Sequence, residues 1–171
     1  ATIAAQLAAG IVRAHPEKES LGQQVGQRLI LDVAGICIAA RHETYVKAAL
    51  SSFEQEGNCT VFGFEQKCGV EGAAFVNGIA AHGEDFDDTY EGGPVHAGVV
   101  IVPALLAAAE RHALSGEQLL RGVAIGVEVM CRLCAVAPTR VHKAGFHPTA
   151  IFGVMGGVAG LGAALNLTEE Q

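Results

Sequence analysis

The feature that most constrains the fold is a glycine-rich apolar segment near the end of the chain, residues 149–165. Pro148 immediately precedes it, and proline favours the first position of a helix. The glycines of this segment recur at helical spacing: Gly153, Gly156, Gly157 and Gly160. Because this face carries no side chains, another helix can lie very close to it. We therefore expect a final helix over 149–165 that packs tightly against a neighbouring helix.

Apolar residues recur at helical spacing along most of the chain, which predicts an all-α, multi-helix domain with minor short strands. Helices are expected over 3–12, 20–40, 45–56, 73–81, 97–113, 119–136 and 149–165. Ser20 with Gln23, and Ser115 with Gln118, match the capping-box pattern that begins a helix. The segments 60–62 and 67–70 favour a short extended pair, too small to form a sheet of its own.

Charge and hydropathy exclude several classes of partner. The 171 residues include 11 Lys plus Arg against 18 Asp plus Glu, and the net charge of -7 argues against a nucleic-acid partner. No apolar run reaches the roughly 18 residues that a membrane span needs, and the beginning of the chain does not resemble a signal peptide. We expect a cytoplasmic protein with neither a membrane nor a nucleic-acid partner.

The cysteines are odd in number, five in all, and lie scattered among apolar residues. This distribution is typical of reduced thiols and not of a disulfide framework. Cys131 and Cys134 form a CxxC pair inside a long apolar helical pattern, with no second pair to complete a zinc site. Core packing is the better interpretation of this pair.

Polar residues gather between residues 75 and 98. Five acids lie between Glu84 and Glu91, and His82 and His96 flank them. The Gly-Gly-Pro run at 92–94 cannot sustain a helix, so the acids and His96 should occupy a loop between two packed helices. Side chains from such a loop can converge on a ligand.

A second group of polar residues, in the run TRVHKAGFHPT, has the opposite charge. It contains Arg140, His142, Lys143 and His147 without a single acid, and therefore suits an anion. His147 precedes Pro148 at a predicted helix start, where the partial positive charge of the helix favours a bound carboxylate. Taken with the acidic loop, this pattern predicts proton transfer on a carboxylic acid substrate.

Two other classes of function compete with this interpretation. A calcium loop is excluded because the pattern lacks the required glycine and has His96 where a bidentate Glu is needed. A metal-binding helical protein is chemically possible, with a transition metal held by His82, Asp85 or Asp88, His96 and His147. The third possibility is a non-catalytic helical assembly domain whose acids form a solvated face.

Three motifs, in order, carry a resemblance to a known family: FVNGIAAHGEDFDDTYEGGPVHAG, VVIVPALLAAAE and GFHPTAIFG. Over essentially the whole chain the sequence resembles the MmgE/PrpD family. That family includes 2-methylcitrate dehydratase, cis-aconitate decarboxylase and iminodisuccinate epimerase, which act on small di- and tricarboxylates without a metal or organic cofactor. The resemblance implies a helical domain that forms a homodimer, and a smaller α/β lid domain.

The resemblance also implies a set of site residues. Four positions match the family's active site and are expected to be catalytic: Asp85, Thr89, His96 and His147. Apart from the resemblance, the basic segment is expected to hold the substrate carboxylates, and the residues expected to bind substrate are Arg140, Lys143 and Asn77. No metal and no cofactor are expected. Of the family's reactions, 2-methylcitrate dehydration is the first expectation, with cis-aconitate decarboxylation and iminodisuccinate epimerisation as alternatives.

The ends of the sequence suggest part of a longer protein. The first residue is Ala1, and the last four residues, 168–171, have the T-x-x-Q pattern of a helix start. We therefore expect residues 1–171 to be the N-terminal portion of the helical domain, without the lid domain. Such a portion is expected to have little or no activity alone.

Overall fold

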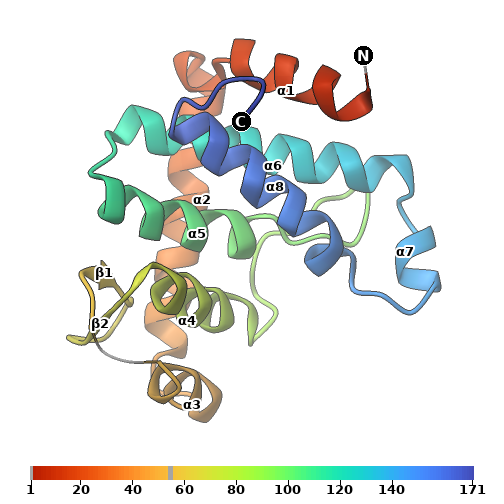
Figure 1. The fold of residues 1–171 in the computed structure, drawn as a ribbon. Helices are drawn as coiled ribbons and strands as arrows, with labels where there is room; N and C mark the ends of the chain where they lie inside the picture. Colours follow the sequence, from red (N-terminus) through yellow and green to blue (C-terminus); the bar gives the residue numbers. More distant parts are fainter. Residues whose placement is uncertain (1, 54–55) are drawn as a thin grey trace.

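The computed structural model describes residues 2–53 and 56–171, and helices dominate it (Figure 1). The α-helices are α1 (Ile3–Arg13), α2 (Ser20–Ala40), α3 (Thr44–Ser51), α4 (Val70–His82), α5 (Gly98–His112), α6 (Gly116–Val136), α7 (Arg140–Lys143) and α8 (Pro148–Ala164). A 3-10 helix (Pro16–Lys18) connects α1 to α2. Strand β1 (Cys59–Thr60) pairs antiparallel with β2 (Lys67–Cys68). The prediction of an all-α domain with minor short strands is confirmed.

The main core lies where α2, α4 and α5 meet. Fully buried side chains come from each of these helices: Val33 from α2, Val76 from α4, and Ile101 and Leu105 from α5. In Figure 1, α2 runs behind the other helices and connects the region of α1 to that of α3. Helix α2 therefore forms a support against which α4 and α5 pack.

Helices α6 and α8 cross at very close range through glycines on both sides, as expected for the glycine-rich segment. A Cβ atom placed on Gly156 would lie 2.7 Å from the carbonyl oxygen of Gly126, and one on Gly160 would lie 2.7 Å from that of Gly122. These distances are too short for any side chain. The four glycines therefore fix the position of α8 along α6.

A buried arginine holds α1 in place. Arg121 of α6 is 8% exposed, and its guanidinium donates hydrogen bonds to backbone carbonyls at the C-terminal ends of α1 and α8. It also donates to Asn166 Oδ1 at 2.8 Å. No residue of α1 is itself buried. The positive charge therefore lies where two helix dipoles are negative, and this arrangement attaches α1 to the body of the domain.

The two predicted capping boxes have different outcomes. At α6 the box is present: the Gln118 N–H donates to Ser115 Oγ at 3.2 Å, and the Ser115 N–H donates to Gln118 Oε1 at 3.0 Å. At α2 the prediction is wrong, because Glu19 is the capping position and Ser20 already lies inside the helix. Glu19 leaves the 3-10 helix in an extended conformation, so α2 begins one residue earlier than the box requires.

The helix predicted over 45–56 is shorter than expected, because α3 ends at Ser51. The hydroxyls of Ser51 and Ser52 both donate to the carbonyl of Ala48, at 2.8 and 2.9 Å. Such local side-chain bonds compete with continuation of a helix. Residues 54 and 55, which the prediction included, lie outside the described residues.

The five cysteines are free thiols, as expected. Cys134 packs in a small cluster with Val95, Ala97 and Met130, and burial raises the pKa of the Cys131 thiol to about 11. The interpretation of the CxxC pair as core packing is therefore confirmed. Across residues 2–53 and 56–171, none of the helices combines the length and apolar character needed to cross a bilayer.

Candidate active site

The loop between α4 and α5 contains a buried carboxylate that two histidines share. Asp87 Oδ2 lies 3.0 Å from Nδ1 of His82, the last residue of α4, and 3.3 Å from Nδ1 of His96, near the end of the loop. The side chain of Asp87 is 0% exposed. Burial from water makes these charge-assisted contacts stronger than they would be on the surface.

This geometry selects one form of each imidazole. A carboxylate only accepts hydrogen bonds, so the nitrogen that faces Asp87 carries a proton, and in a neutral ring the other nitrogen is then free to accept one. In His82 and His96 the nitrogen facing Asp87 is Nδ1, which leaves each Nε2 as the basic atom. The arrangement therefore presents two imidazoles that can take up or release a proton.

Asp85 and Thr89 approach His96 from the same loop. Asp85 Oδ1 lies 3.9 Å from His96 Nε2, and Thr89 Oγ1 lies 3.5 Å from His96 Nδ1. Asp85 has a left-handed backbone conformation, with φ at 57°, which aspartate tolerates better than most residues. Both side chains can therefore orient His96 or a ligand beside it.

A third imidazole reaches this cluster from the beginning of α8. The ring centroid of His147 lies 5.7 Å from that of His82, and the His82 and His96 centroids are 5.0 Å apart. Next to His147 along α8, the hydroxyl of Thr149 accepts a hydrogen bond from the backbone N–H of His96 at 3.1 Å. This bond connects the loop directly to the beginning of α8.

Two further contacts hold the loop in place. Asp88 accepts hydrogen bonds from the backbone N–H groups of Ala97 and Gly98, at 3.2 and 2.9 Å, at the beginning of α5. Burial raises the pKa of Asp88, and the neighbouring Asp87 charge adds to this effect, while the two N–H donors oppose it. At the other end of the loop, the Tyr45 hydroxyl donates to Glu84 Oε1 at 2.9 Å.

A groove of about 690 Å³ opens beside the histidines, between α4, α5 and the beginning of α8. Its polar groups come from Glu71, His82, His147 and Thr149, and apolar residues such as Phe75 line much of the rest. The volume is large enough for a small-molecule ligand. Two of the three imidazoles, those of His82 and His147, therefore border a space that a substrate can enter.

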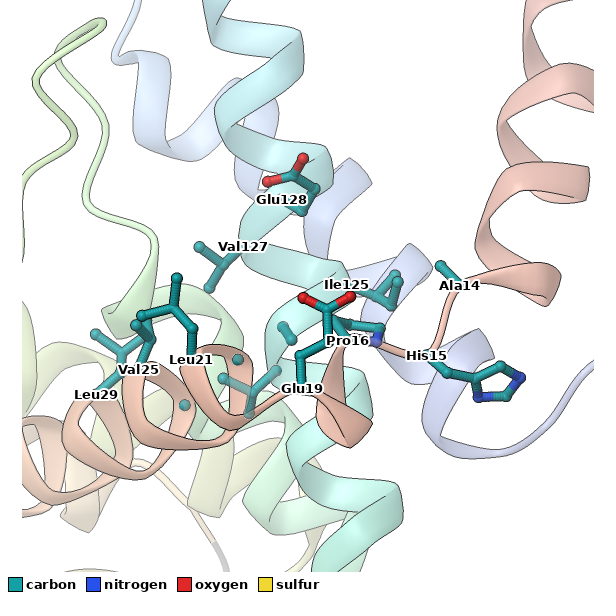
Figure 2. Close-up of a pocket in the computed structure, with 14 residues that line it drawn as sticks. Ala14, His15, Pro16, Glu19, Leu21, Val25, Leu29, Ile125, Val127 and Glu128 are labelled. Atoms are coloured by element: carbon teal, nitrogen blue, oxygen red, sulfur yellow. The ribbon is translucent and has the colours of Figure 1, made fainter.

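A second groove, of about 650 Å³, lies between the beginning of α2 and α6 (Figure 2). Its lining includes none of the predicted site residues. Figure 2 shows the carboxylates of Glu19 and Glu128 beside it, together with the apolar side chains of Leu21 and Val25. Two acids are unfavourable for a polycarboxylate, so this groove does not fit the predicted chemistry.

The structure brings together the four residues predicted to be catalytic. The three residues predicted to bind substrate form no hydrogen bond or ion pair with this cluster among the described residues. Arg140 and Lys143 lie exposed on α7, and neither side chain forms a hydrogen bond or ion pair with any described residue. Asn77 is 2% exposed, and its amide bonds to the backbone of Phe62 and Thr60, both at 2.9 Å. Its amide is therefore engaged in holding the end of β1 and the segment that follows it.

Sequence reasoning missed two functional candidates and undervalued a third. Asp87 was one of five acids in a loop, and nothing in the sequence marked it as the buried one. Thr149 follows the histidine motif but has no pattern of its own. His82 was considered only as a metal ligand, although its position at the end of a predicted apolar helix could have placed it beside the loop acids.

The same residues form a group with the donor types that bind metal ions. One donor atom from each of His82, Asp85, Asp87 and His96 lies within 4.8 Å of every other. Asp88, which the sequence offered as an alternative to Asp85, is not part of this group because its oxygens accept from backbone N–H groups. The cluster can therefore support either proton transfer or metal binding.

Comparison with known proteins identifies relatives of this chain. The sequence model of the MmgE/PrpD N-terminal domain matches residues 5–171. Cis-aconitate decarboxylase of Aspergillus terreus is 32% identical over 153 residues, which cover 84% of this chain and 31% of the relative. The human cis-aconitate decarboxylase is 37% identical over 109 residues, covering 58% of this chain and 21% of the relative. The chain thus spans about a third or less of these relatives.

Proposed function

This chain belongs to the MmgE/PrpD family, and on that premise we propose that it forms the proton-transfer part of a lyase or isomerase acting on a small di- or tricarboxylate. The observation that carries the proposal is the buried Asp87 carboxylate shared by His82 and His96, next to a groove that His82 and His147 line. Acid–base chemistry needs groups of this kind next to a substrate-sized space.

The chemistry of such substrates requires a group that moves a proton at carbon. Dehydration removes a proton from a carbon next to a carboxylate and expels a hydroxyl group, which leaves as water after taking up a second proton. Decarboxylation breaks a carbon–carbon bond, releases CO₂ and leaves an electron pair on the substrate that must accept a proton. In both reactions an imidazole Nε2 of the cluster is the proposed donor or acceptor.

The four proposed catalytic residues have two kinds of role. Asp85 and Thr89 orient His96 or the substrate through hydrogen bonds, and His96 and His147 move protons. Asp87 is a positioning residue, because it contacts imidazoles and not the substrate. A transition state that charges an imidazole would be stabilised by the Asp87 carboxylate at 3.0–3.3 Å.

Positive charge near the beginning of α8 is the proposed binding element for the substrate carboxylates. Helix α8 presents free backbone N–H groups and a partial positive charge at its N-terminus, where His147 is the capping residue. Arg140 and Lys143 lie on α7, shortly before it, without any acidic partner among the described residues. We propose that their side chains contact the outer carboxylates of a bound substrate.

We propose cis-aconitate as the substrate. The relatives named above are cis-aconitate decarboxylases, which favours cis-aconitate as the first substrate to examine. 2-Methylcitrate dehydration, the first expectation from the motifs, and iminodisuccinate epimerisation are the alternatives. All three reactions use a proton at an activated carbon, so the shared cluster serves any of them.

The complete enzyme is proposed to contain more than this chain. An α/β lid domain and a homodimer through the helical domain are proposed from the family resemblance. The outer face of α8 supports such an assembly, because it exposes Ile151, Val154, Met155 and Val158 at helical spacing. The five free thiols support a reducing compartment such as the cytoplasm.

The proposal is tested by incubating the full-length protein in deuterated buffer with cis-aconitate, 2-methylcitrate and iminodisuccinate, and following each by NMR. Loss or exchange of a substrate proton on one acid identifies the reaction. His147→Ala should lower kcat by about 10²- to 10⁴-fold, the usual contribution of a proton-transfer group. His112→Ala, an exposed histidine at the end of α5 that lies outside the site, is the matched control. Wild-type turnover in His147→Ala would contradict the proposed role.

A further inference from the structure

We propose that His82, Asp87 and His96 form a binding site for a divalent transition-metal ion of the Zn²⁺ class, with Asp85 as a fourth ligand from the surface. This proposal concerns a ligand that the acid–base function does not need. The binding itself is independent of the proposed function, whereas its inhibitory consequence, given below, rests on that function.

The spacing of the donor atoms fits a single ion. Zinc binds imidazole nitrogen and carboxylate oxygen at about 2.0–2.2 Å, so neighbouring ligands of a tetrahedral ion lie roughly 3.3–3.5 Å apart. The nitrogen-to-oxygen distances from Asp87 to His82 and His96 are 3.0 and 3.3 Å, and all four donor atoms lie within 4.8 Å of one another. Small side-chain movements would bring His82, His96 and Asp87 around an ion. The Asp85 carboxylate, which lies 3.9 Å from Nε2 of His96, would turn towards the ion from the solvent side.

A second, independent observation points to a ligand at this position. The whole Asp87 residue, backbone included, is 7% exposed. Its side-chain atom Oδ1 is buried and has no hydrogen-bond partner among the described residues. A buried carboxylate oxygen without a partner is uncommon and costly, because it has lost its contact with water and gained nothing in return. The two imidazoles face the other oxygen, Oδ2, so a cation held between them would compensate Oδ1 by binding both oxygens of the carboxylate.

The donor set favours a borderline transition metal over magnesium or calcium. Two imidazoles and one or two carboxylates suit Zn²⁺ and its first-row neighbours, whereas Mg²⁺ and Ca²⁺ need mostly oxygen ligands. An ion can reach the site from solvent, since the side chains of Asp85 and His82 are 79% and 33% exposed. The Asp85 carboxylate therefore lies on the entry side.

Metal binding and proton transfer would exclude each other at this cluster. An ion at Nδ1 displaces the proton that faces Asp87, and the single proton of the neutral ring then sits on Nε2. The nitrogen that would act as the base can therefore no longer accept a proton. The ion would therefore hold both imidazoles and Asp87 in an inactive complex. The expected effect of Zn²⁺ is inhibition that a chelator reverses.

The test is a Zn²⁺ titration of chelator-treated full-length protein against a chromophoric zinc indicator. We expect one high-affinity Zn²⁺ per chain, which excess Mg²⁺ does not displace. His82→Gln and Asp87→Asn should each weaken binding by more than the roughly 10- to 100-fold typical of losing an outer-shell partner. The matched control is His112→Gln, at the opposite end of α5 and about 21 Å along that helix from Gly98.

The geometry of the site and the folding of the variants are measured separately. Co²⁺ in place of Zn²⁺ should give visible absorption bands that are lost in His82→Gln, and the folding of each variant is checked by circular dichroism without metal. His82 is partly exposed, so its variant is informative even where Asp87→Asn unfolds the protein. Binding that is absent in the wild type, or unchanged in His82→Gln, overturns the site. Stoichiometric binding without loss of turnover overturns only the inhibition.

Discussion

Asp87 Oδ2 lies 3.0 Å from Nδ1 of His82, in a side chain that solvent does not reach. The same oxygen is also within 3.3 Å of His96 Nδ1, so one buried charge orients two imidazoles that belong to different parts of the chain. Because the carboxylate is shared, a change at Asp87 alters the orientation of both rings. Replacing Asp87 therefore tests its positioning role while both proton-transferring imidazoles stay in place.

Asp87→Asn should lower kcat of the full-length enzyme by about 10²- to 10³-fold with a smaller change in KM, because an amide cannot stabilise an imidazole that becomes charged in the transition state. The pH profile of kcat should also change, which a purely structural defect would not produce. The measurement is steady-state kinetics between pH 5 and 9. Asp32→Asn, an exposed carboxylate on α2, is the control and should retain wild-type kinetics.

Gly156→Ala should lower the free energy of unfolding by about 1–3 kcal/mol, the usual cost of overpacking, because the new methyl group would meet the Gly126 carbonyl. The adjacent Gly157 has no neighbouring atom within 4 Å of an added Cβ, so Gly157→Ala should be neutral or stabilising by about 0.5–1 kcal/mol. Urea denaturation of both variants measures the difference. Equal stabilities would show that the helices do not depend on glycine contact.

Arg121→Ala should lower the free energy of unfolding by about 3 kcal/mol, because several hydrogen bonds to a buried charge are lost. Amide hydrogen exchange should increase most in α1, which has no buried residue of its own and is held by this guanidinium. The control is Arg132→Ala, whose exposed pair with Glu128 should contribute less than about 0.5 kcal/mol. Undisturbed exchange in α1 would contradict the proposed attachment.

The raised pKa of Asp88 predicts a specific dependence of stability on pH. The folded protein keeps this proton at pH values where the unfolded chain, with a pKa near 3.8, has already lost it. Stability from this group is therefore complete below pH 3.8 and is lost as pH rises through the folded pKa. The unfolding free energy of wild type minus that of Asp88→Asn should fall over this range. A difference that rises with pH would refute the shift.

Sequence patterns predicted the helices well, because packing follows the apolar spacing. The glycines of α8 predicted a close helix neighbour, and the contact with Gly122 and Gly126 of α6 agrees with that. Helix ends were less certain. The Ser20 pattern was overridden by the extended conformation of Glu19, and α3 ended early where Ser51 and Ser52 bond back to Ala48.

Site residues that belong to a motif could be predicted from the sequence. Site residues whose role depends on which side chain is buried could not. His96 and His147 were expected from their motifs, and they lie in one cluster. Asp87 and Asp88 are adjacent acids that look alike in the sequence, yet one faces two imidazoles and the other caps α5. Only the path of the loop distinguishes them. Asn77 could not be assigned either, because its backbone partners become known only from the fold.

The glycine contact between α6 and α8 has a consequence for the precision of catalysis. Where two backbones are in direct contact, no side chain can change its rotamer to accommodate a displacement of one helix along the other. Only one register of α8 against α6 therefore fits. A slip by one residue would move His147 about 1.5 Å along the helix axis and turn it by about 100°, which would separate it from His82. The alignment of the imidazoles is thus set partly by residues that have no side chain, two or more helical turns away from the chemistry.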